Sequence, residues 1–186
     1  MPKDNSHFDI KLDIRKKYLN KYGGNAVLDC CQGDMRLWGE LRKEYPNLKY
    51  MGVDLKPKRG RHKVDSARLL KIEGIVWDVV DIDTYGNPFD HYQNLCTTLN
   101  HECTVFLTYG TSVGGLTQTS NAQKSMIGLP RKTPTVLAYK AVKKYIDICI
   151  HSCRRYGIIP SDIIEVKPSD TVCYYAMRLK KQENVS

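Results

Sequence analysis

The sequence contains no long apolar run. A helix that crosses a membrane needs about 20 consecutive apolar residues, and no stretch of the 186 residues approaches that length. The first residues, MPKDNSHFDIKLDI, also lack the uninterrupted apolar core of a secretory signal. Neither the glycine-rich phosphate-binding loop of a P-loop nucleoside triphosphatase nor a Ser/His/Asp nucleophile motif is present. We therefore expect a protein that neither crosses a membrane nor works through those two chemistries.

The cysteines lack the paired spacing of a metal site or a disulfide framework. There are seven of them, and the close pairs are Cys30/Cys31 and Cys149/Cys153. Neither pair repeats the two-residue spacing of a zinc site, so we interpret the cysteines as buried free thiols, with zinc binding as the alternative. Free thiols are typical of a reducing compartment such as the cytoplasm. The five histidines are too widely spread for a metal cluster: His7, His62, His91, His101 and His151.

Acidic residues are outnumbered by basic ones. The chain has 20 Asp and Glu against 29 Lys and Arg, a net charge of +9 and a pI of about 9.2. This excess favours a polyanionic partner, of which nucleic acid is the most common, and the alternative is a basic protein without such a partner. Two of the basic residues, Lys11 and Arg15, fall four apart on one face of an expected helix. The length suits a single α/β domain over 1–186, which begins with a helical segment over 1–24.

Short β-branched runs alternate with helical periodicity along the chain, which is typical of a parallel α/β sheet. The pattern predicts helices over 8–22, 35–45 and 92–99, and a later helix whose start is marked by Thr133-Pro134. The strands are expected over 26–30, 49–55, 61–64, 75–82, 104–108, 163–166 and 172–179. The last two strands are joined by the turn KPSD and are expected to form an antiparallel hairpin.

This order of elements resembles that of the class I methyltransferases, which close with such a hairpin, over nearly the whole chain. The resemblance implies a Rossmann-like α/β fold with a central, mostly parallel seven-stranded sheet, helices on both faces and a C-terminal hairpin. It also implies S-adenosylmethionine as the cofactor, and no metal. In AVLDCCQGDMRLW, the residues Asp29, Cys31 and Gly33 match the first motif of the family, acid–x–small–x–Gly, which approaches the methionine part of the cofactor. Met35 stands where many relatives have another glycine.

Two further segments match cofactor-binding positions of that family. GVDL places Asp54 at the end of the second strand, where relatives hold the ribose hydroxyls, and a loop cap is the alternative. VDSARLL places Asp65 and Ser66 where relatives contact the adenine, although either residue could equally cap a helix. A dinucleotide is disfavoured, because its pyrophosphate needs the tighter G-x-G-x-x-G turn.

The segment DIDTYGNPF resembles the fourth motif of the tRNA guanine-N2 dimethyltransferases, which reads Asp-Pro-Phe-Gly followed soon by Pro. Asp81 and Asp83 alternate with an apolar residue and should point to the same side of the strand. The resemblance implies that Asp83 holds the exocyclic amine and that Tyr85 stacks on the base or lines its pocket. Thr84 replaces the proline of the family, and a side-chain turn formed by Asp83 and Thr84 is the alternative.

The segment 109–132 is rich in Gly, Ser and Thr, and we expect it to be a substrate loop whose Lys124, Arg131 and Lys132 contact a polyanion. The tRNA dimethyltransferases carry an additional tRNA-gripping domain that this sequence lacks, so a partner protein could supply that grip. We therefore predict methylation of an exocyclic amine on a nucleic-acid base, in RNA rather than DNA. The alternatives are a DNA-base or small-molecule methyltransferase, and a non-catalytic nucleic-acid-binding module with a vestigial cofactor pocket.

Overall fold

The computed structural model describes residues 7–56, 62–84, 87–110, 119–136 and 139–182. Its centre is a seven-stranded sheet with the strand order β3-β2-β1-β4-β5-β7-β6. The first five strands are parallel, and β7 lies antiparallel between β5 and β6. The strands are β1 (Ala26–Asp29), β2 (Lys49–Asp54), β3 (His62–Lys63), β4 (Val79–Ile82), β5 (Cys103–Gly110), β6 (Ile158–Val166) and β7 (Val172–Lys181). The predicted Rossmann-like fold with its closing hairpin is confirmed.

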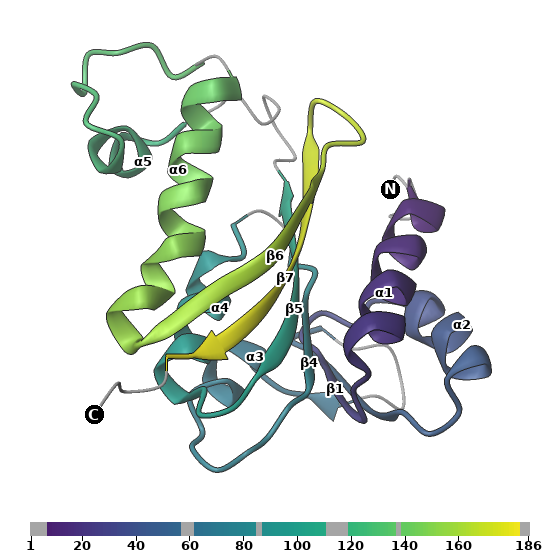
Figure 1. Cartoon of the computed structure of the whole chain (residues 1–186). Coiled ribbons are helices and arrows are strands. Elements are labelled where there is room, and N and C mark those ends of the chain that lie inside the picture. The colour runs from purple at the N-terminus through teal and green to yellow at the C-terminus, as the bar shows by residue number, and fades with distance from the viewer. Residues whose placement is uncertain (1–6, 57–61, 85–86, 111–118, 137–138, 183–186) are drawn as a thin grey trace.

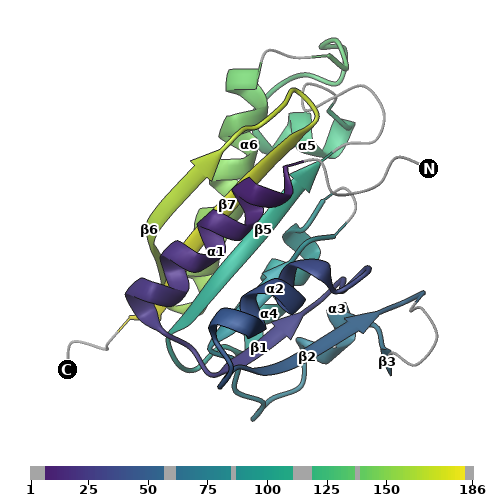
Figure 2. The same cartoon turned by 90° about the vertical axis from the view of Figure 1, so that its right-hand side faces the viewer.

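Helices cover both faces of this sheet (Figure 1, Figure 2). They are α1 (Phe8–Tyr22), α2 (Arg36–Glu44), α3 (Ser66–Leu69), α4 (Phe89–Thr98), α5 (Asn121–Met126) and α6 (Tyr139–His151), followed by a 3-10 turn over Ser152–Tyr156. Helices α1 and α2 lie on one face, whereas α3, α4 and α6 lie on the other. The short helix α5 lies beside the N-terminal end of α6.

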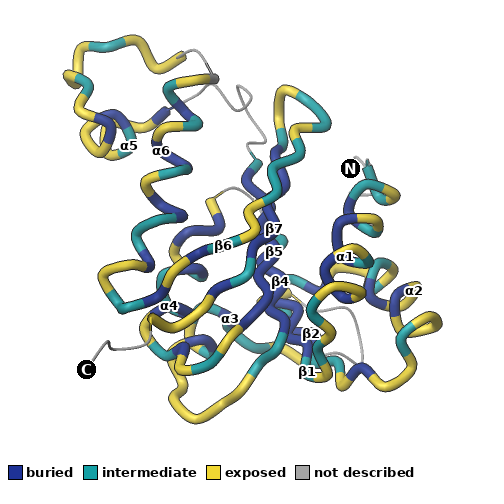
Figure 3. The backbone as a smooth tube through the Cα atoms, in the orientation of Figure 1, coloured by how far each residue is buried: buried dark blue, intermediate teal, exposed yellow. Residues whose placement is uncertain are grey.

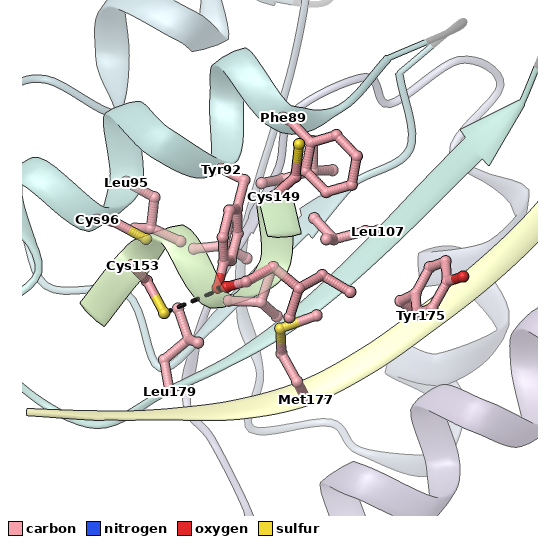
Figure 4. Packing of buried hydrophobic residues seen from close by; sticks show 14 of the residues in the cluster. Phe89, Tyr92, Leu95, Cys96, Leu107, Cys149, Cys153, Tyr175, Met177 and Leu179 are labelled. Atoms are coloured by element: carbon pink, nitrogen blue, oxygen red, sulfur yellow. Dashed lines mark hydrogen bonds between the residues drawn. The ribbon is translucent and has the colours of Figure 1, made fainter. Parts of the chain in front are cut away.

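Each face of the sheet packs its own apolar core. On the side of α1 and α2, Tyr18, Trp38 and Phe106 belong to one buried cluster. The rings of Tyr18 and Phe106 pack edge to face, with their centroids 5.7 Å apart. On the side of α4 and α6, Tyr92 is fully buried among apolar residues (Figure 4). Its hydroxyl donates to the backbone oxygen of Ile150 at 2.8 Å. The central strands are therefore buried nearly throughout (Figure 3), as a sheet covered on both faces requires.

The cysteines bear out their interpretation as apolar, unpaired residues. All seven are free thiols; six are buried and Cys31 is half-buried. Cys96, Cys149 and Cys153 lie in the core between α4 and α6 (Figure 4). Within the described part of the chain, no cluster of three or more metal-ligating side chains occurs. No helix there is long and apolar enough to cross a membrane either.

The segment predicted as a substrate loop over 109–132 contains regular structure. Strand β5 continues to Gly110, and α5 begins after Ser120 with a capping box. The Ser120 hydroxyl accepts from the backbone amide of Gln123 at 3.2 Å, and the Gln123 side-chain oxygen accepts from the Ser120 amide at 2.7 Å. The signal was present in the sequence, because Ser-x-x-Gln is the signature of such a box.

The predicted helix start at Thr133-Pro134 is wrong, because α6 begins at Tyr139. The Thr133 amide instead closes a turn on Pro130 at 3.0 Å, and the Thr135 oxygen accepts from the backbone amide of Thr119 at 2.8 Å. The backbone groups before α6 thus hold the α5 region together rather than starting a helix.

The strand predicted over 75–82 is shorter than expected. Its pairing with β1 begins at Val79, opposite Val27. The Asp78 carboxylate accepts hydrogen bonds from the backbone amides of Asn25 and Ala26, at 2.7 and 2.9 Å, where β1 begins. These side-chain contacts occupy the amides that would otherwise extend the ladder, so the apolar residues before Asp78 lie outside the sheet.

Candidate active site

Aspartates gather where the parallel strands end. Asp29 and Asp54 are the last residues of β1 and β2, Asp81 lies in β4, and Asp83 follows that strand. The register places Asp29 directly opposite Asp81, and these residues are only 5% and 1% exposed. Open α/β sheets bind ligands at the carboxyl ends of their strands. The edge that the sequence indicated therefore does carry the predicted carboxylates.

Arg15, on α1, forms a two-point ion pair with Asp81. Its Nε and Nη2 atoms donate to the two carboxylate oxygens at 2.8 and 2.7 Å, and the Trp38 indole nitrogen donates to one of them at 2.8 Å. Arg15 is only 2% exposed, so each charge depends on the other for compensation. Burial disfavours the charged guanidinium, but Asp81 outweighs burial and raises the pKa of Arg15.

Lys11 lies one turn earlier on α1 and pairs with Asp83. Its Nζ donates to the Asp83 carboxylate at 2.5 Å, and the two side chains are 8% and 22% exposed. Burial alone would raise the pKa of Asp83, but the charges of Lys11 and Arg15 outweigh it and hold the pKa below its usual value. Asp83 is therefore an ionised carboxylate that remains partly accessible to solvent.

The contribution of α1 to this edge was missed in the choice of site residues. Its signal was the spacing of Lys11 and Arg15, four apart on a face that also carries the buried Ile14 and Tyr18. Two cations on a buried helix face require buried anions, and Asp81 and Asp83 supply them. The sequence does not show against which face of the sheet α1 packs, so this pairing was not predictable from spacing alone.

Asp29 accepts hydrogen bonds from neutral groups. The Tyr50 hydroxyl donates to one carboxylate oxygen at 2.8 Å and the Cys31 amide to the other at 3.2 Å. Burial, followed by the charges of Asp81 and Asp83, raises the pKa of Asp29 to about 8. The group is therefore mostly protonated at neutral pH, and a cation brought beside it would favour the ionised form.

The turn from β1 into α2 contains two residues with a left-handed backbone. Gly33 and Met35 lie in the left-handed region, with φ of 50° and 61°. Glycine adopts this conformation readily, whereas a residue with a side chain is strained in it. A glycine at the position of Met35 would therefore relieve this strain.

Two buried polar atoms beside these aspartates have no hydrogen-bond partner among the described residues. They are Nε2 of Gln32, which follows β1, and the hydroxyl oxygen of Thr84, which follows Asp83. The Gln32 side-chain oxygen lies over Gly52, where an added Cβ would approach it to 2.6 Å. Unsatisfied buried polar groups cost roughly 1–3 kcal/mol each. A polar ligand bound at this edge of the sheet offers one way to satisfy them.

The other predicted cofactor residues lie along the same edge. One oxygen of Asp54 accepts from a backbone amide two residues further on, at 2.9 Å. Asp65 caps α3 by accepting from two of its backbone amides, which is the helix-cap alternative. Ser66 is buried, and its hydroxyl lies 3.0 Å from Nε2 of His91.

Of the three residues predicted to contact a polyanion, one is buried and two are exposed. Lys124 is only 2% exposed, and its ammonium group donates to the backbone oxygen of Thr133 at 2.7 Å. It therefore stabilises the α5 region and does not present its charge to a substrate in this arrangement, which corrects the expectation. Arg131 and Lys132 are exposed as expected. Tyr85 lies outside the described residues.

The fold has counterparts among solved structures, although the sequence matches no protein-family model and no curated protein. Trm1 from Pyrococcus horikoshii, solved with S-adenosyl-L-methionine, has a TM-score of 0.66 at 14% identity and covers 98% of this chain. The present chain spans 58% of that Trm1 chain. The plantazolicin methyltransferase BpumL, solved with S-adenosylhomocysteine and a peptide analogue, has a TM-score of 0.56 at 12% identity, covering 94% of this chain and 86% of its own.

A proposed hemolysin from Streptococcus thermophilus is also similar, with a TM-score of 0.61 at 10% identity, covering 93% of this chain and 66% of its own. At such low identities these likenesses establish the fold and nothing finer. The chain has the Rossmann-like fold of the class I methyltransferases, as the sequence predicted. Its activity has to be argued from the residues at the edge of the sheet.

Proposed function

We propose that the protein is an S-adenosylmethionine-dependent methyltransferase that acts on an exocyclic amine of a nucleic-acid base, in RNA. The observation that carries this proposal is Asp83, an ionised and partly accessible carboxylate at the ligand-binding edge of a methyltransferase fold. Such a carboxylate can accept hydrogen bonds from the amine and orient its lone pair towards the methyl group. Lys11 fixes the position of Asp83 and keeps it ionised.

The cofactor would lie along the edge from β1 to α3. We assign Asp29, Cys31 and Gly33 to its methionine part, Asp54 to the ribose hydroxyls, and Asp65 and Ser66 to the adenine. When bound, the cofactor supplies an electrophilic methyl group on a sulfonium. The unsatisfied Gln32 amide supports this assignment, because it offers a buried hydrogen-bond donor at the same edge.

The nucleic-acid substrate is supported by charge and by one structural neighbour. The chain carries a net charge of +9, and Trm1 is among the proteins that share its fold. Tyr85 is assigned to stacking on the base, which contributes roughly 1–3 kcal/mol per base. The proposal also includes a partner protein that adds RNA-binding surface. It further places the protein in a reducing compartment such as the cytoplasm.

One observation favours a second candidate, a non-catalytic nucleic-acid-binding module. The Lys11 ammonium already occupies one oxygen of Asp83, as a structural ion pair would. The two candidates differ in the variant Asp83→Ala. A methyltransferase would lose transfer of labelled methyl groups to tRNA, whereas a binding module would show no transfer in the wild type and unchanged RNA binding in the variant.

The first experiment is a calorimetric titration of the protein with S-adenosylmethionine and S-adenosylhomocysteine. We expect micromolar binding that Asp54→Ala abolishes, because the ribose loses its carboxylate acceptor. The matched control is Asp170→Ala, which removes a carboxylate whose side chain is 95% exposed in the hairpin turn and should bind as the wild type does. A wild-type protein that binds neither compound would refute the methyltransferase proposal.

A further inference from the structure

A long stretch of the chain carries charge of one sign. Residues 103–146 contain no Asp or Glu, while they include Lys124, Arg131, Lys132, Lys140, Lys143 and Lys144. The stretch begins in β5, includes α5 and runs into α6. It therefore concentrates about a fifth of the basic residues where no acid of the same segment can neutralise them.

The structure separates these six residues by role. Lys124 is buried and bonded to Thr133, and Lys143 forms ion pairs with Asp147 and Glu165. The remaining four residues are exposed, and among the described residues none has a carboxylate partner within salt-bridge distance: Arg131, Lys132, Lys140 and Lys144. The Lys144 ammonium does donate to the backbone oxygen of Ile127, at the long distance of 3.5 Å. We call these four residues the α5–α6 basic surface.

Two lysines of this surface share one face of a helix. Lys140 and Lys144 are four residues apart on α6, so their side chains project from neighbouring turns, about 6 Å apart along the axis. Ile148, 37% exposed, continues the same face by one more turn. Arg131 and Lys132 precede α6, in the segment that joins it to α5 (Figure 1).

The helices α5 and α6, beside and on which this surface lies, contact the end of β5 and the segment that follows Asp83. The Gln123 side chain of α5 donates to the hydroxyl of Tyr109, near the carboxyl end of β5, at 3.2 Å. The Asn87 amide, four residues after Asp83, donates to the hydroxyl of Tyr145 on α6 at 3.0 Å. Figure 2 shows α5 at the end of the sheet towards which the arrowhead of β5 points. A polymer bound to this surface could thus reach the edge that carries Asp83.

We propose that the α5–α6 basic surface binds the phosphate backbone of the RNA substrate and positions it for reaction at Asp83. The inference rests on the proposed function and extends it, because it names where the polymer is held. Flexible lysines and arginines on an exposed surface without acids are suited to successive phosphates and give affinity without sequence preference.

The test measures RNA binding in the absence of cofactor, by fluorescence anisotropy of a labelled 20-nucleotide single-stranded RNA at several salt concentrations. The variant is Lys140→Ala with Lys144→Ala. The matched control is Lys17→Ala with Lys49→Ala, which removes the same charge from exposed positions on α1 and at the start of β2. The proposal predicts a several-fold weaker Kd for the α6 variant and a salt dependence shallower by about 1.4, since each lost phosphate contact contributes about 0.7.

Equal weakening in the α6 variant and its control would overturn the proposal, because the effect would then follow net charge alone. Undetectable wild-type binding at low salt would also overturn it and would leave the surface to a partner other than nucleic acid. Calorimetry with S-adenosylmethionine on the same α6 variant separates the two proposals. Cofactor binding equal to that of the wild type, together with lost RNA binding, would support both.

Discussion

The ion pair between Arg15 and Asp81 offers the sharpest test of the structure, because it needs no substrate. In Arg15→Met, the Asp81 side chain, which is only 2% exposed, loses its guanidinium partner and retains only the Trp38 indole among its strong donors. Removing one partner of a buried pair costs about 3–5 kcal/mol. For a domain of this size each kcal/mol lowers the Tm by roughly 2–4 °C, so we expect a fall of roughly 6–20 °C. Urea and thermal unfolding followed by circular dichroism measure both quantities.

Two comparisons separate this reasoning from a general loss of packing. Lys21→Met breaks the exposed pair of Lys21 with Asp162 and should lower the stability far less, because solvent screens an exposed ion pair. Adding Asp81→Asn to Arg15→Met removes the uncompensated charge while keeping an acceptor for Trp38, so it should recover most of the lost stability. If Arg15→Met costs no more than Lys21→Met, or if the double variant is less stable than the single one, the buried ion pair does not have the role assigned here.

Three further predictions follow from the same edge of the sheet. Met35→Gly should be neutral or stabilising by up to about 1 kcal/mol in urea unfolding, although glycine usually destabilises, because φ at Met35 is 61°. Asp29→Asn should flatten the pH dependence of stability between about pH 4 and 8. In the wild type, Asp29 has a pKa of about 8 in the folded state and releases its proton at much lower pH in the unfolded chain. Rising pH through this range therefore favours unfolding. Binding of S-adenosylmethionine at pH 7 should release a proton from Asp29, seen as a buffer-dependent calorimetric enthalpy that is lost in Asp29→Asn. An enthalpy that is the same in buffers of different ionisation enthalpy would refute that last expectation.

The sheet was predictable because its signals are local. β-Branched runs, glycines after α1 and a proline after α2 mark most elements within a few residues of their true ends, although β6, predicted over 163–166, begins at Ile158. The errors arose where side chains compete for backbone groups. Asp78 caps the start of β1 and shortens β4, and Lys124 binds the Thr133 oxygen before α6 begins. Such contacts join residues far apart in the chain or in irregular segments, and no periodic pattern records them.

The candidate site was predictable only in part, for a related reason. Asp29 and Asp54 end their strands and Asp83 follows β4 directly, so the fold alone brings them to one edge. The partners Arg15 and Lys11 lie on a helix whose position depends on how α1 packs against β5 and β7. Their pairing is set by tertiary packing, which the sequence expresses only as two cations on an otherwise buried face.

The charge balance of this edge argues for a cationic ligand. Asp81 is matched by Arg15 and Asp83 by Lys11, so of the three interacting aspartates only Asp29 is held by neutral donors. Burial beside two other carboxylates makes its ionisation costly, and the raised pKa is the consequence. One added positive charge would relieve that cost, and S-adenosylmethionine carries such charges on its ammonium and sulfonium groups. A dinucleotide would instead bring the negative charges of its pyrophosphate to an edge already rich in carboxylates. The electrostatics of Asp29 thus favour the same cofactor as the turn that follows it.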